Sequence, residues 1–441
     1  MTKLFHLVVL FVATFLIGAG FGPLAYGQSM KAGCFLIDGQ GHELEEANGT
    51  DAHKQVVIAS TSKVLTTFWA IKKLGPDFRF QTRVHITPLA DNSYDVHIQG
   101  GGDPFFGLSQ LQFLMSELNS AGVQVIHQLS FDENFKYLTD PRSSPATNGV
   151  LESHGWRQGD PSVSLIQSEI VQSLNRSSFS NMSKLNAELA QAQIPARNNL
   201  SIKVLRTIPL GQDQFQITPE TKSFKMQSNA LSVLLKDMNR VSNNYISNVL
   251  FDDLGGPQAF ESFYQSLGLK DEVDFVNGSG MWIINDRGQK EYNQASCNAV
   301  VSTLALLDQI LEKKQHDLQD VMAVIGIYEG NECSTMDGDP NRHKCGGVPY
   351  NVDPLIGATV AKTGSVAMTT ALTGRLSTNQ ADIYFGYFYA PGSAREAITA
   401  QVKDLAKTYS GTKDLNYQPK PFQYFQKDSG FVNITNSLRN S

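Results

Sequence analysis

The sequence predicts an α+β protein in which the two ends of the chain build one domain and the middle forms a second, β-rich domain. Residues 28–78 and 224–441 combine segments of helical periodicity with strand-like apolar runs, whereas residues 79–223 consist mostly of short strands, glycine turns and Ser/Asn-rich loops. Because the same mixture of helix and strand patterns stands on both sides of a segment with a different pattern, the middle segment is predicted to be an insertion. With 441 residues, 41% of them apolar, the chain is long enough to bury a sizeable core.

Residues 1–27 are expected to be a secretory signal. Lys3 precedes an apolar run at 4–17, which is shorter than the ~20 residues of an ordinary membrane span, and small residues at Ala25 and Gly27 follow a Gly/Pro break. An uncleaved anchor is the alternative. A cleaved signal places the mature chain in the periplasm or outside the cell, as a soluble protein.

The elements of the first domain follow from turn signals and periodicity. Strands at 34–38 and 42–47 surround a glycine turn, and a helix at 60–74 ends at Gly75 and Pro76. This helix is apolar on most sides, as a central buried helix would be. Beyond the insertion, the pattern predicts helices at 231–238, 245–254, 300–311 and 393–409, strands at 355–376 and 383–389, and an extended aromatic tail.

The four cysteines are Cys34, Cys297, Cys333 and Cys345. Because an exported protein meets an oxidising environment, disulfides are expected. Cys333 and Cys345 are close in sequence and flank a polar, turn-rich loop, so we predict that they form a disulfide. The state of Cys34 and Cys297 is left open.

A metal site in the same loop is the alternative reading. Residues 337–341 begin like a calcium-binding loop, but Arg342 stands where that loop needs Gly and Val348 where it needs Glu. We therefore expect no metal, and no organic cofactor either.

Three short polar motifs are candidates for chemistry. Ser60 and Lys63 lie three positions apart at the start of a helix and so share a face, where a lysine of lowered pKa can act as a base. Ser242 and Asn244 lie in a polar break between two helices. Each pattern recurs elsewhere, Ser-x-x-Lys at 410–413 and Ser-x-Asn at 173–175 and 377–379, so neither is specific alone.

The third motif, Lys362-Thr363-Gly364, occurs once, inside a strand-like run. Glycine there lets a ligand approach the backbone closely, while the lysine and threonine side chains suit an anion. Its uniqueness and its place on a strand make it more informative than the other two motifs.

Taken in order, the three motifs resemble the set used by penicillin-recognising serine enzymes. Their surroundings resemble one subfamily, the class C low-molecular-mass penicillin-binding proteins, which are D-Ala-D-Ala carboxypeptidases and endopeptidases. The resemblance covers about residues 33 to 405 and is thin from 110 to 220. It also rests on residues 101–104, 238–244, 278–280 and 361–365. The chain departs from the family's usual residues at Ile58, Asn243, Asn277 and Ile283.

The resemblance implies a penicillin-binding, transpeptidase-like fold, an antiparallel sheet flanked by helices, and a serine DD-peptidase activity. Ser60 would be the nucleophile and Lys63 its base, Ser242 would relay the proton, and Asn244 would hold the substrate backbone. Lys362 and Thr363 would bind a terminal carboxylate, Gly364 would admit the substrate, and the backbone N–H groups of Ser60 and Ser365 would form the oxyanion hole.

The family comparison also implies a substrate-binding role for Asp103, which matches the position that reads the amino end of a diaminopimelate-like side chain. Ile283 replaces the arginine expected for the carboxylate of that side chain, and Arg287 is a nearby substitute of unknown placement. The 182 positions between Ser60 and Ser242 leave room for one inserted domain (242 − 60). The inserted region is too short for the extra small domain of the larger family members, so less protein should cover the active-site cleft. Large, cross-linked substrates would then have access, which favours endopeptidase activity.

The expected partners are peptidoglycan stem peptides and cross-links, with β-lactam antibiotics as covalent inhibitors. Nucleic acid is not expected, because the net charge of −6 gives no basic surface. Two other functions stay open: a β-lactamase, for which the sequence offers no added deacylation base, and a non-catalytic peptidoglycan-binding protein, which the intact motif residues disfavour.

Overall fold

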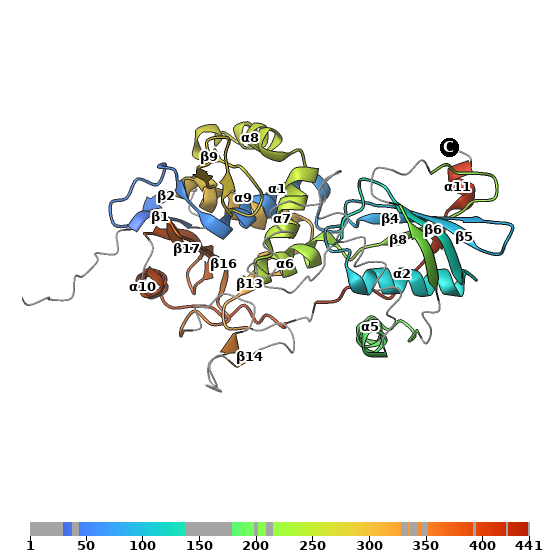
Figure 1. Ribbon diagram of the computed structural model, residues 1–441. Helices are drawn as coiled ribbons and strands as arrows, with labels where there is room; N and C mark the ends of the chain where they lie inside the picture. Colours follow the sequence, from blue (N-terminus) through green and yellow to red (C-terminus); the bar gives the residue numbers. More distant parts are fainter. Residues whose placement is uncertain are drawn as a thin grey trace, which may run out of the picture.

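A computed structural model gives the arrangement of most of the chain. It describes residues 30–37, 44–137, 179–197, 202–208, 215–327, 334–335, 343–344, 352–390, 394–419 and 422–439. These residues form two lobes, each built around a six-stranded sheet (Figure 1). The predicted α+β class is confirmed. The expected signal at 1–27 lies outside the described residues.

The sheet of the first lobe is antiparallel throughout, with strand order β13-β16-β17-β18-β1-β2. Its strands are β1 (Met30–Ile37), β2 (Leu44–Glu46), β13 (Ala323–Val324), β16 (Thr359–Val366), β17 (Thr369–Ser377) and β18 (Asp382–Tyr389). The first strand of the chain therefore pairs with one from its last quarter. This pairing brings a segment from the start of the chain and one from its last quarter into the same lobe.

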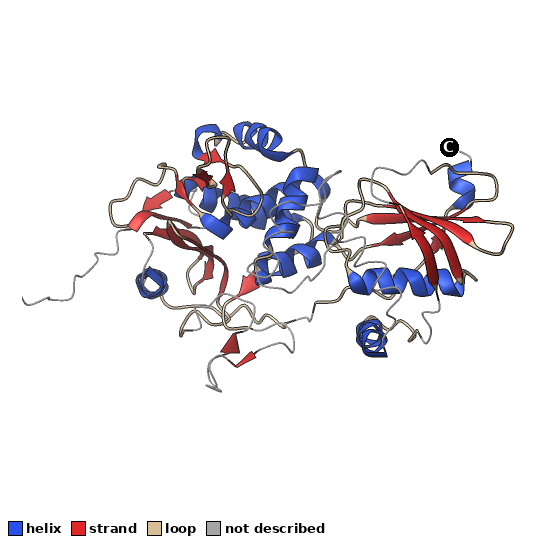
Figure 2. Ribbon diagram, in the orientation of Figure 1, coloured by secondary structure: helices blue, strands red, loops and turns tan. Residues whose placement is uncertain are grey.

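Helices lie on both faces of this sheet, with α9 (Cys297–Lys313) on one and α10 (Ala394–Thr408) on the other (Figure 2). Behind α9 lies α1 (Ser62–Leu74), which in turn contacts α6 (Leu231–Val241) and α7 (Asn244–Asp253), and α8 (Gly256–Ser266) packs on α7. Successive side chains of a strand point to opposite faces. Phe388 of β18 accordingly joins the core formed with α1 and α9, whereas Phe385 joins the core formed with Ile398 and Val402 of α10.

Helix α1 lies at the centre of the first lobe and is buried along most of its length. All its residues from Ser62 to Ile71 are buried. Trp69 packs edge-to-face against Phe251 of α7 and Phe260 of α8, with ring centroids 5.5 and 5.3 Å apart. Such aromatic contacts add to the area the rings bury, so α1 is held rigidly from several sides.

A disulfide joins Cys34 of β1 to Cys297 at the start of α9, with Cα atoms 5.9 Å apart. The sequence left the state of both cysteines open, because 263 positions separate them and spacing carries no signal at that range. Cys333 and Cys345 lie outside the described residues, so their pairing stays a prediction.

The sheet of the second lobe is mixed, with strand order β19-β8-β4-β5-β6-β7. Its strands are β4 (Gln81–Pro88), β5 (Tyr94–Gln99), β6 (Val125–Phe131), β7 (Lys203–Thr207), β8 (Lys222–Gln227) and β19 (Val432–Asn433). The β5–β6 and β6–β7 pairs are parallel. Helix α2 (Leu108–Ser120) connects the parallel strands β5 and β6 and lies along the sheet (Figure 1). Helix α5 (Phe179–Gln191) packs against α2. The sequence did not predict α2, α5 or α8.

The end of the C-terminal tail, from Phe422 onward, belongs to the second lobe, whereas residues 411–417 contact the first. Strand β19 pairs with β8, α11 (Thr435–Arg439) follows it, and Phe431 stacks on Phe224 with centroids 5.2 Å apart. The predicted boundary at 223/224 also falls inside β8. In the structure, β8 lies in the second lobe, and the aromatic residues from Phe422 onward pack there as well.

Short elements complete the description: β3 (Val56–Val57), β9 (Val273–Asp274) and β12 (Gln294–Ala295) form a small sheet, and β10 (Ile283–Ile284) pairs with β11 (Lys290–Glu291). The others are β14 (Ser334–Thr335), paired with β15 (His343–Lys344), and the 3-10 turns η1 (Ala59–Thr61), η2 (Lys270–Glu272) and η3 (Leu318–Asp320). Across the described ranges, no helix has the length and apolar character needed to cross a bilayer.

Candidate active site

Ser60 lies in η1, the tight turn that leads directly into α1. The preceding residue, Ala59, has a φ of 50°, a left-handed conformation that non-glycine residues seldom adopt. Two glycines hold this turn from either side. A Cβ on Gly280 would lie 1.9 Å from the Ala59 carbonyl oxygen, and one on Gly364 would lie 3.1 Å from the Ser60 nitrogen. Both positions therefore need glycine for the close approach.

Lys63 is fully buried one helical turn after Ser60. Its Nζ donates to three oxygens: Ser60 Oγ at 3.2 Å, Asn244 Oδ1 at 2.7 Å and the Ser279 carbonyl at 3.0 Å. The amine is thus fixed against the Ser60 hydroxyl by oxygens from two other segments. This geometry matches a serine with a lysine as its base.

Ser242 and Asn244 occupy the junction between α6 and α7. Ser242 ends α6 in a left-handed conformation, with φ 57° and ψ 42°. Asn243 then caps α7, because its side chain accepts a hydrogen bond from the Ile246 nitrogen at 3.1 Å. This sharp break between two helices presents Ser242 on one side and Asn244 at the first turn of the next helix.

Lys362 extends from β16 toward Ser242. Its Nζ donates to Ser242 Oγ at 3.0 Å and to the carbonyl of Thr363 at 2.9 Å, and only 2% of the residue is exposed. Burial disfavours the charged amine and lowers the pKa of Lys362 to about 7. The site therefore contains a cation whose charge changes near neutral pH.

The rest of the Lys-Thr-Gly motif follows on the same strand. Thr363 is half-buried, Gly364 is buried against η1, and Ser365 is exposed. The structure thus brings together Ser60, Lys63, Ser242, Asn244 and Lys362 with residues 363–365, as the three motifs predict.

The loop 277–280 adds a part of the site that the motifs do not identify. The Ser279 carbonyl contacts Lys63, and Asn277 Oδ1 accepts from the nitrogens of Ser279 and Gly280 at 3.0 and 2.9 Å. The Gly-Ser-Gly run marks the loop in sequence, but not which backbone atom contacts the lysine.

Asp103 follows β5 of the second lobe, next to Gly102, whose backbone approaches Asp253 at the end of α7 in the first lobe. The Asp103 carboxyl accepts from the Phe105 nitrogen at 2.9 Å and lines a small cavity with Thr82, Gln110 and Tyr424. The residue is 6% exposed, and burial raises the pKa of Asp103 to about 7. Its contact with a substrate ammonium group stays a prediction.

Residues 281–284 form the start of an exposed hairpin. Ile283 is 38% exposed in β10, and Arg287 lies in the turn that leads to β11. In this turn the Arg287 nitrogen donates to Asn285 Oδ1 at 3.0 Å. The structure therefore places Arg287 at the tip of the hairpin.

The second Ser-x-x-Lys pattern, at 410–413, has a different setting. Ser410 follows the end of α10 with a φ of 66°, and its Oγ accepts from Gln380 Nε2 at 2.5 Å. Lys413 lies three residues after Ser410, but both follow the end of α10, so they do not share a helical face. The pattern here is a surface turn.

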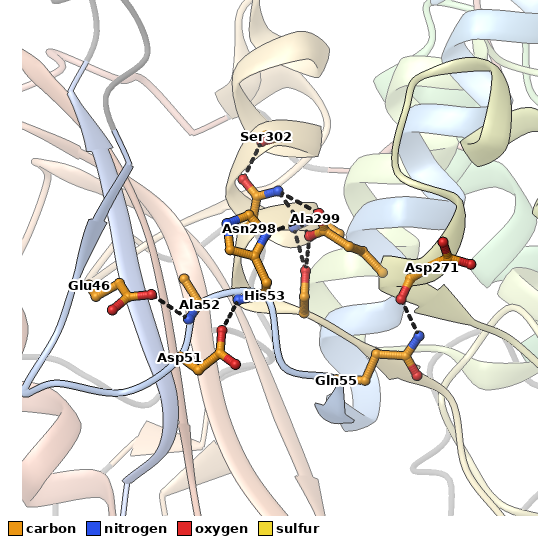
Figure 3. A network of polar contacts seen from close by, with 11 residues as sticks. Glu46, Asp51, Ala52, His53, Gln55, Asp271, Asn298, Ala299 and Ser302 are labelled. Carbon is orange, nitrogen blue, oxygen red and sulfur yellow. Dashed lines mark hydrogen bonds and ion pairs between the residues drawn. The ribbon is translucent and has the colours of Figure 1, made fainter.

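A network of polar contacts anchors the segment before Ser60 (Figure 3). The Glu272 carboxylate accepts from Asn298 Nδ2 at 2.9 and 3.0 Å and from Ser296 Oγ, and contacts His53 Nδ1 at 3.1 Å. The Asn298 nitrogen donates to the Ala52 carbonyl at 2.9 Å. His53 is exposed, so its part is to fasten a loop rather than to act as a base. Within the described ranges, no three His, Cys, Asp or Glu side chains are grouped to hold a metal ion.

Comparisons with known proteins agree with this geometry. The model of the D-Ala-D-Ala carboxypeptidase 3 (S13) family matches residues 40–146. Among curated proteins, none matches. The chain is similar to the predatory endopeptidase Bd3459 of Bdellovibrio bacteriovorus, solved with the immunity protein Bd3460. The identity is 29% and the TM-score 0.77, and the match covers 92% of this chain and 99% of that one.

Two further solved structures extend the comparison. Bd3459 has also been solved acylated by penicillin G, and this form matches at 29% identity with a TM-score of 0.72, over 92% and 99% of the two chains. Penicillin-binding protein 4 (dacB) of Haemophilus influenzae matches at 16% identity with a TM-score of 0.55, over 88% and 92%. The last likeness is one of fold.

Proposed function

We propose that this chain, which is similar to the D-Ala-D-Ala carboxypeptidase 3 (S13) family over residues 40–146, cleaves peptidoglycan peptides through an acyl-enzyme on Ser60. It is a serine DD-peptidase. The observation that carries the choice of nucleophile is the hydrogen bond between Lys63 Nζ and Ser60 Oγ, 3.2 Å long, inside a cluster of all three motifs.

In the acylation step, Ser60 Oγ attacks the carbonyl carbon of the penultimate D-Ala, and neutral Lys63 takes the hydroxyl proton. The backbone N–H groups of Ser60 and Ser365 would stabilise the negative charge that develops on the carbonyl oxygen. Because Asn244 and Ser279 fix the amine in place, little reorganisation is needed for this transfer.

The leaving amine needs a proton as its C–N bond breaks. Ser242 would donate its hydroxyl proton to that nitrogen and recover one from the Lys63 ammonium group. Lys362 contacts Ser242 directly, and its charged form would bind the terminal carboxylate together with Thr363. Asn244 would hold the substrate backbone through its amide nitrogen.

Water completes the cycle by attacking the ester carbonyl. Lys63 takes a proton from the water, the bond between Ser60 Oγ and the acyl carbon breaks, and Ser60 regains its proton. No metal or organic cofactor takes part in these steps.

We further propose that cross-linked peptides are good substrates, so that the enzyme acts substantially as an endopeptidase. The relatives Bd3459 and Bd0816 are described as endopeptidases. A single inserted lobe would leave branched substrates access to Ser60. Against this, Ile283 stands where the family has an arginine for the side-chain carboxylate, so selectivity for that side chain should be loosened. The substrate also implies export to the periplasm or the exterior, in agreement with the signal predicted at 1–27.

The nucleophile is tested with a fluorescent penicillin. Ser60→Ala should abolish labelling, because no hydroxyl remains beside Lys63, while Ser410→Ala should label like the wild type. A peptide digest analysed by mass spectrometry locates the adduct. An adduct on a peptide without Ser60 would refute the assignment. Rapid loss of the label would indicate a β-lactamase, and absence of labelling in the wild type a non-catalytic binding protein.

The substrate preference is tested by digesting purified cell-wall sacculi and separating the muropeptides. Loss of cross-linked dimers with a matching gain of monomers is expected. The result that contradicts it is trimming of pentapeptides with dimers left intact, which would indicate a carboxypeptidase alone. Ser60→Ala enzyme serves as the control, because it retains the fold but lacks the nucleophile.

A further inference from the structure

Asn293 is a fully buried residue between the segment that carries Ser60 and the loop that contacts Lys63. It directly precedes β12, whose residues pair with β3 on one side and β9 on the other. We infer that Asn293 is a positioning residue for acylation, which sets the Ser279 carbonyl, and through it Lys63, relative to Ser60. The inference rests on the proposed function of Ser60.

The amide side chain of Asn293 bonds to three backbone groups of one short segment. Its Oδ1 accepts from the nitrogens of Val276 and Asn277 at 2.9 and 3.2 Å, and its Nδ2 donates to the Asn277 carbonyl at 2.7 Å. One planar amide thus uses both acceptor positions and a donor on adjacent peptide groups. These bonds fix the orientation of the backbone just before the loop 277–280.

Asn277 carries that orientation into the loop. Its Oδ1 accepts from the nitrogens of Ser279 and Gly280, and its Nδ2 donates to the Met281 carbonyl at 2.6 Å. The Ser279 peptide is thereby held with its carbonyl toward Lys63 Nζ, 3.0 Å away. Gly278 is fixed as well, since its carbonyl accepts from Thr66 and Ser247 at 2.8 and 2.7 Å.

The backbone of Asn293 reaches the nucleophile's own segment. Its carbonyl accepts from the Ile58 nitrogen at 3.3 Å, two residues before Ser60. The contacts therefore close a ring that runs from Ile58 through Asn293, Asn277, Ser279 and Lys63 back to Ser60. A displacement at Asn293 changes the position of the base and of the hydroxyl relative to each other.

Only an amide of this length satisfies the three backbone groups. An alanine leaves two N–H groups and one carbonyl without this partner, and a buried polar group that loses its partner destabilises the local structure. An aspartate keeps both acceptor bonds but faces the Asn277 carbonyl with an oxygen instead of a donor. The two variants therefore remove different parts of the same contact set.

The test compares Asn293→Ala with a matched control, Asn239→Ala. Asn239 is also buried, and its Nδ2 donates to Thr67 Oγ1 and the Val321 carbonyl at 2.9 and 2.8 Å, away from the loop 277–280. Acylation by a chromogenic β-lactam is followed by stopped flow well below the unfolding temperature, per mole of folded protein. The data separate the non-covalent dissociation constant from the acylation rate constant.

In Asn293→Ala the acylation rate constant should fall roughly 10- to 100-fold with a nearly unchanged dissociation constant, because a misplaced base slows chemistry more than binding. Asn239→Ala should lose stability but keep its acylation rate constant. Equal rate constants in Asn293→Ala and the wild type, or an equal fall in both variants, would overturn the inference.

Asn293→Asp keeps the test usable if the alanine variant does not fold. This variant retains the two acceptor bonds, so its acylation rate constant should lie below that of the wild type by less than the 10- to 100-fold fall expected for Asn293→Ala. An acylation rate constant equal to that of the wild type would overturn the inference. Failure of the proposed function is distinguishable, since in that case the wild type itself forms no adduct on Ser60.

Discussion

Each lobe contains a buried ionisable side chain with a pKa shifted to near neutrality, Lys362 in the first lobe and Asp103 in the second. Burial lowers the pKa of Lys362 from 10.5 to about 7 and raises that of Asp103 from 3.8 to about 7. Their surroundings differ. Lys362 donates to the hydroxyl of Ser242, whereas the contact of Asp103 is a backbone N–H in a small cavity. Similar desolvation is therefore expected to have different consequences, for substrate binding through Lys362 under the proposed function and for stability through Asp103.

The free energy of unfolding should depend on the charge of Asp103. Of the two predictions made for these groups, Asp103→Asn is expected to give the larger effect. The folded carboxyl binds a proton below about pH 7, but the unfolded one only below about 3.8. Between these values the folded state binds more protons, so its stability falls as the pH rises, by up to about 4 kcal/mol at pH 8. The neutral amide removes this loss.

Unfolding by denaturant at pH 5 and pH 8 measures the effect. Asp103→Asn should be more stable than the wild type at pH 8, and the gain should shrink at pH 5. A gain of equal size at both pH values would show that Asp103 does not titrate differently in the folded state. The same variant also tests substrate recognition. A raised KM for peptides with a free side-chain ammonium group would support the contact that the family comparison implies, and an unchanged KM would argue against it.

The sequence predicted the first lobe better than the second for physical reasons. Ser60, Lys63, Ser242, Asn244 and Lys362 stand in short motifs because chemistry restricts their residue types, and the structure brings them together. Asn293 was missed, because a single buried asparagine that bonds only to backbone leaves no pattern in the sequence.

The remaining differences have the same kind of cause. Helix α2 was missed although Leu111, Leu114 and Leu118 stand at helical spacing, because the glycine turns around it were taken to indicate short strands. The pairing of Cys34 with Cys297 depends on the position of α9 over β1, which spacing does not encode. The aromatic tail was assigned to the first domain by its place in the sequence, but Phe431 packs on Phe224 in the second.

The last prediction concerns the charge of Lys362. The expected effect is the smaller one, a shift in the pH at which kcat/KM falls. If the charged amine binds the terminal carboxylate, kcat/KM should fall as the pH rises through about 7, because the free enzyme loses this cation. Lys362→Arg keeps its charge at all these pH values. Its alkaline limb should therefore move up by at least roughly one pH unit.

The measurement is the pH at which kcat/KM falls, and not its absolute value. The larger guanidinium can lower the absolute value for steric reasons, because Lys362 is only 2% exposed. Lys236→Arg is the matched control. Lys236 is also buried and donates to the carbonyls of Gln319 and Met322 at 2.7 and 2.6 Å, in a part of the lobe outside the catalytic cluster. This control should keep the wild-type limb. If the limb of Lys362→Arg also stays in place, another group controls the alkaline fall, and Lys362 does not bind the carboxylate through its charge.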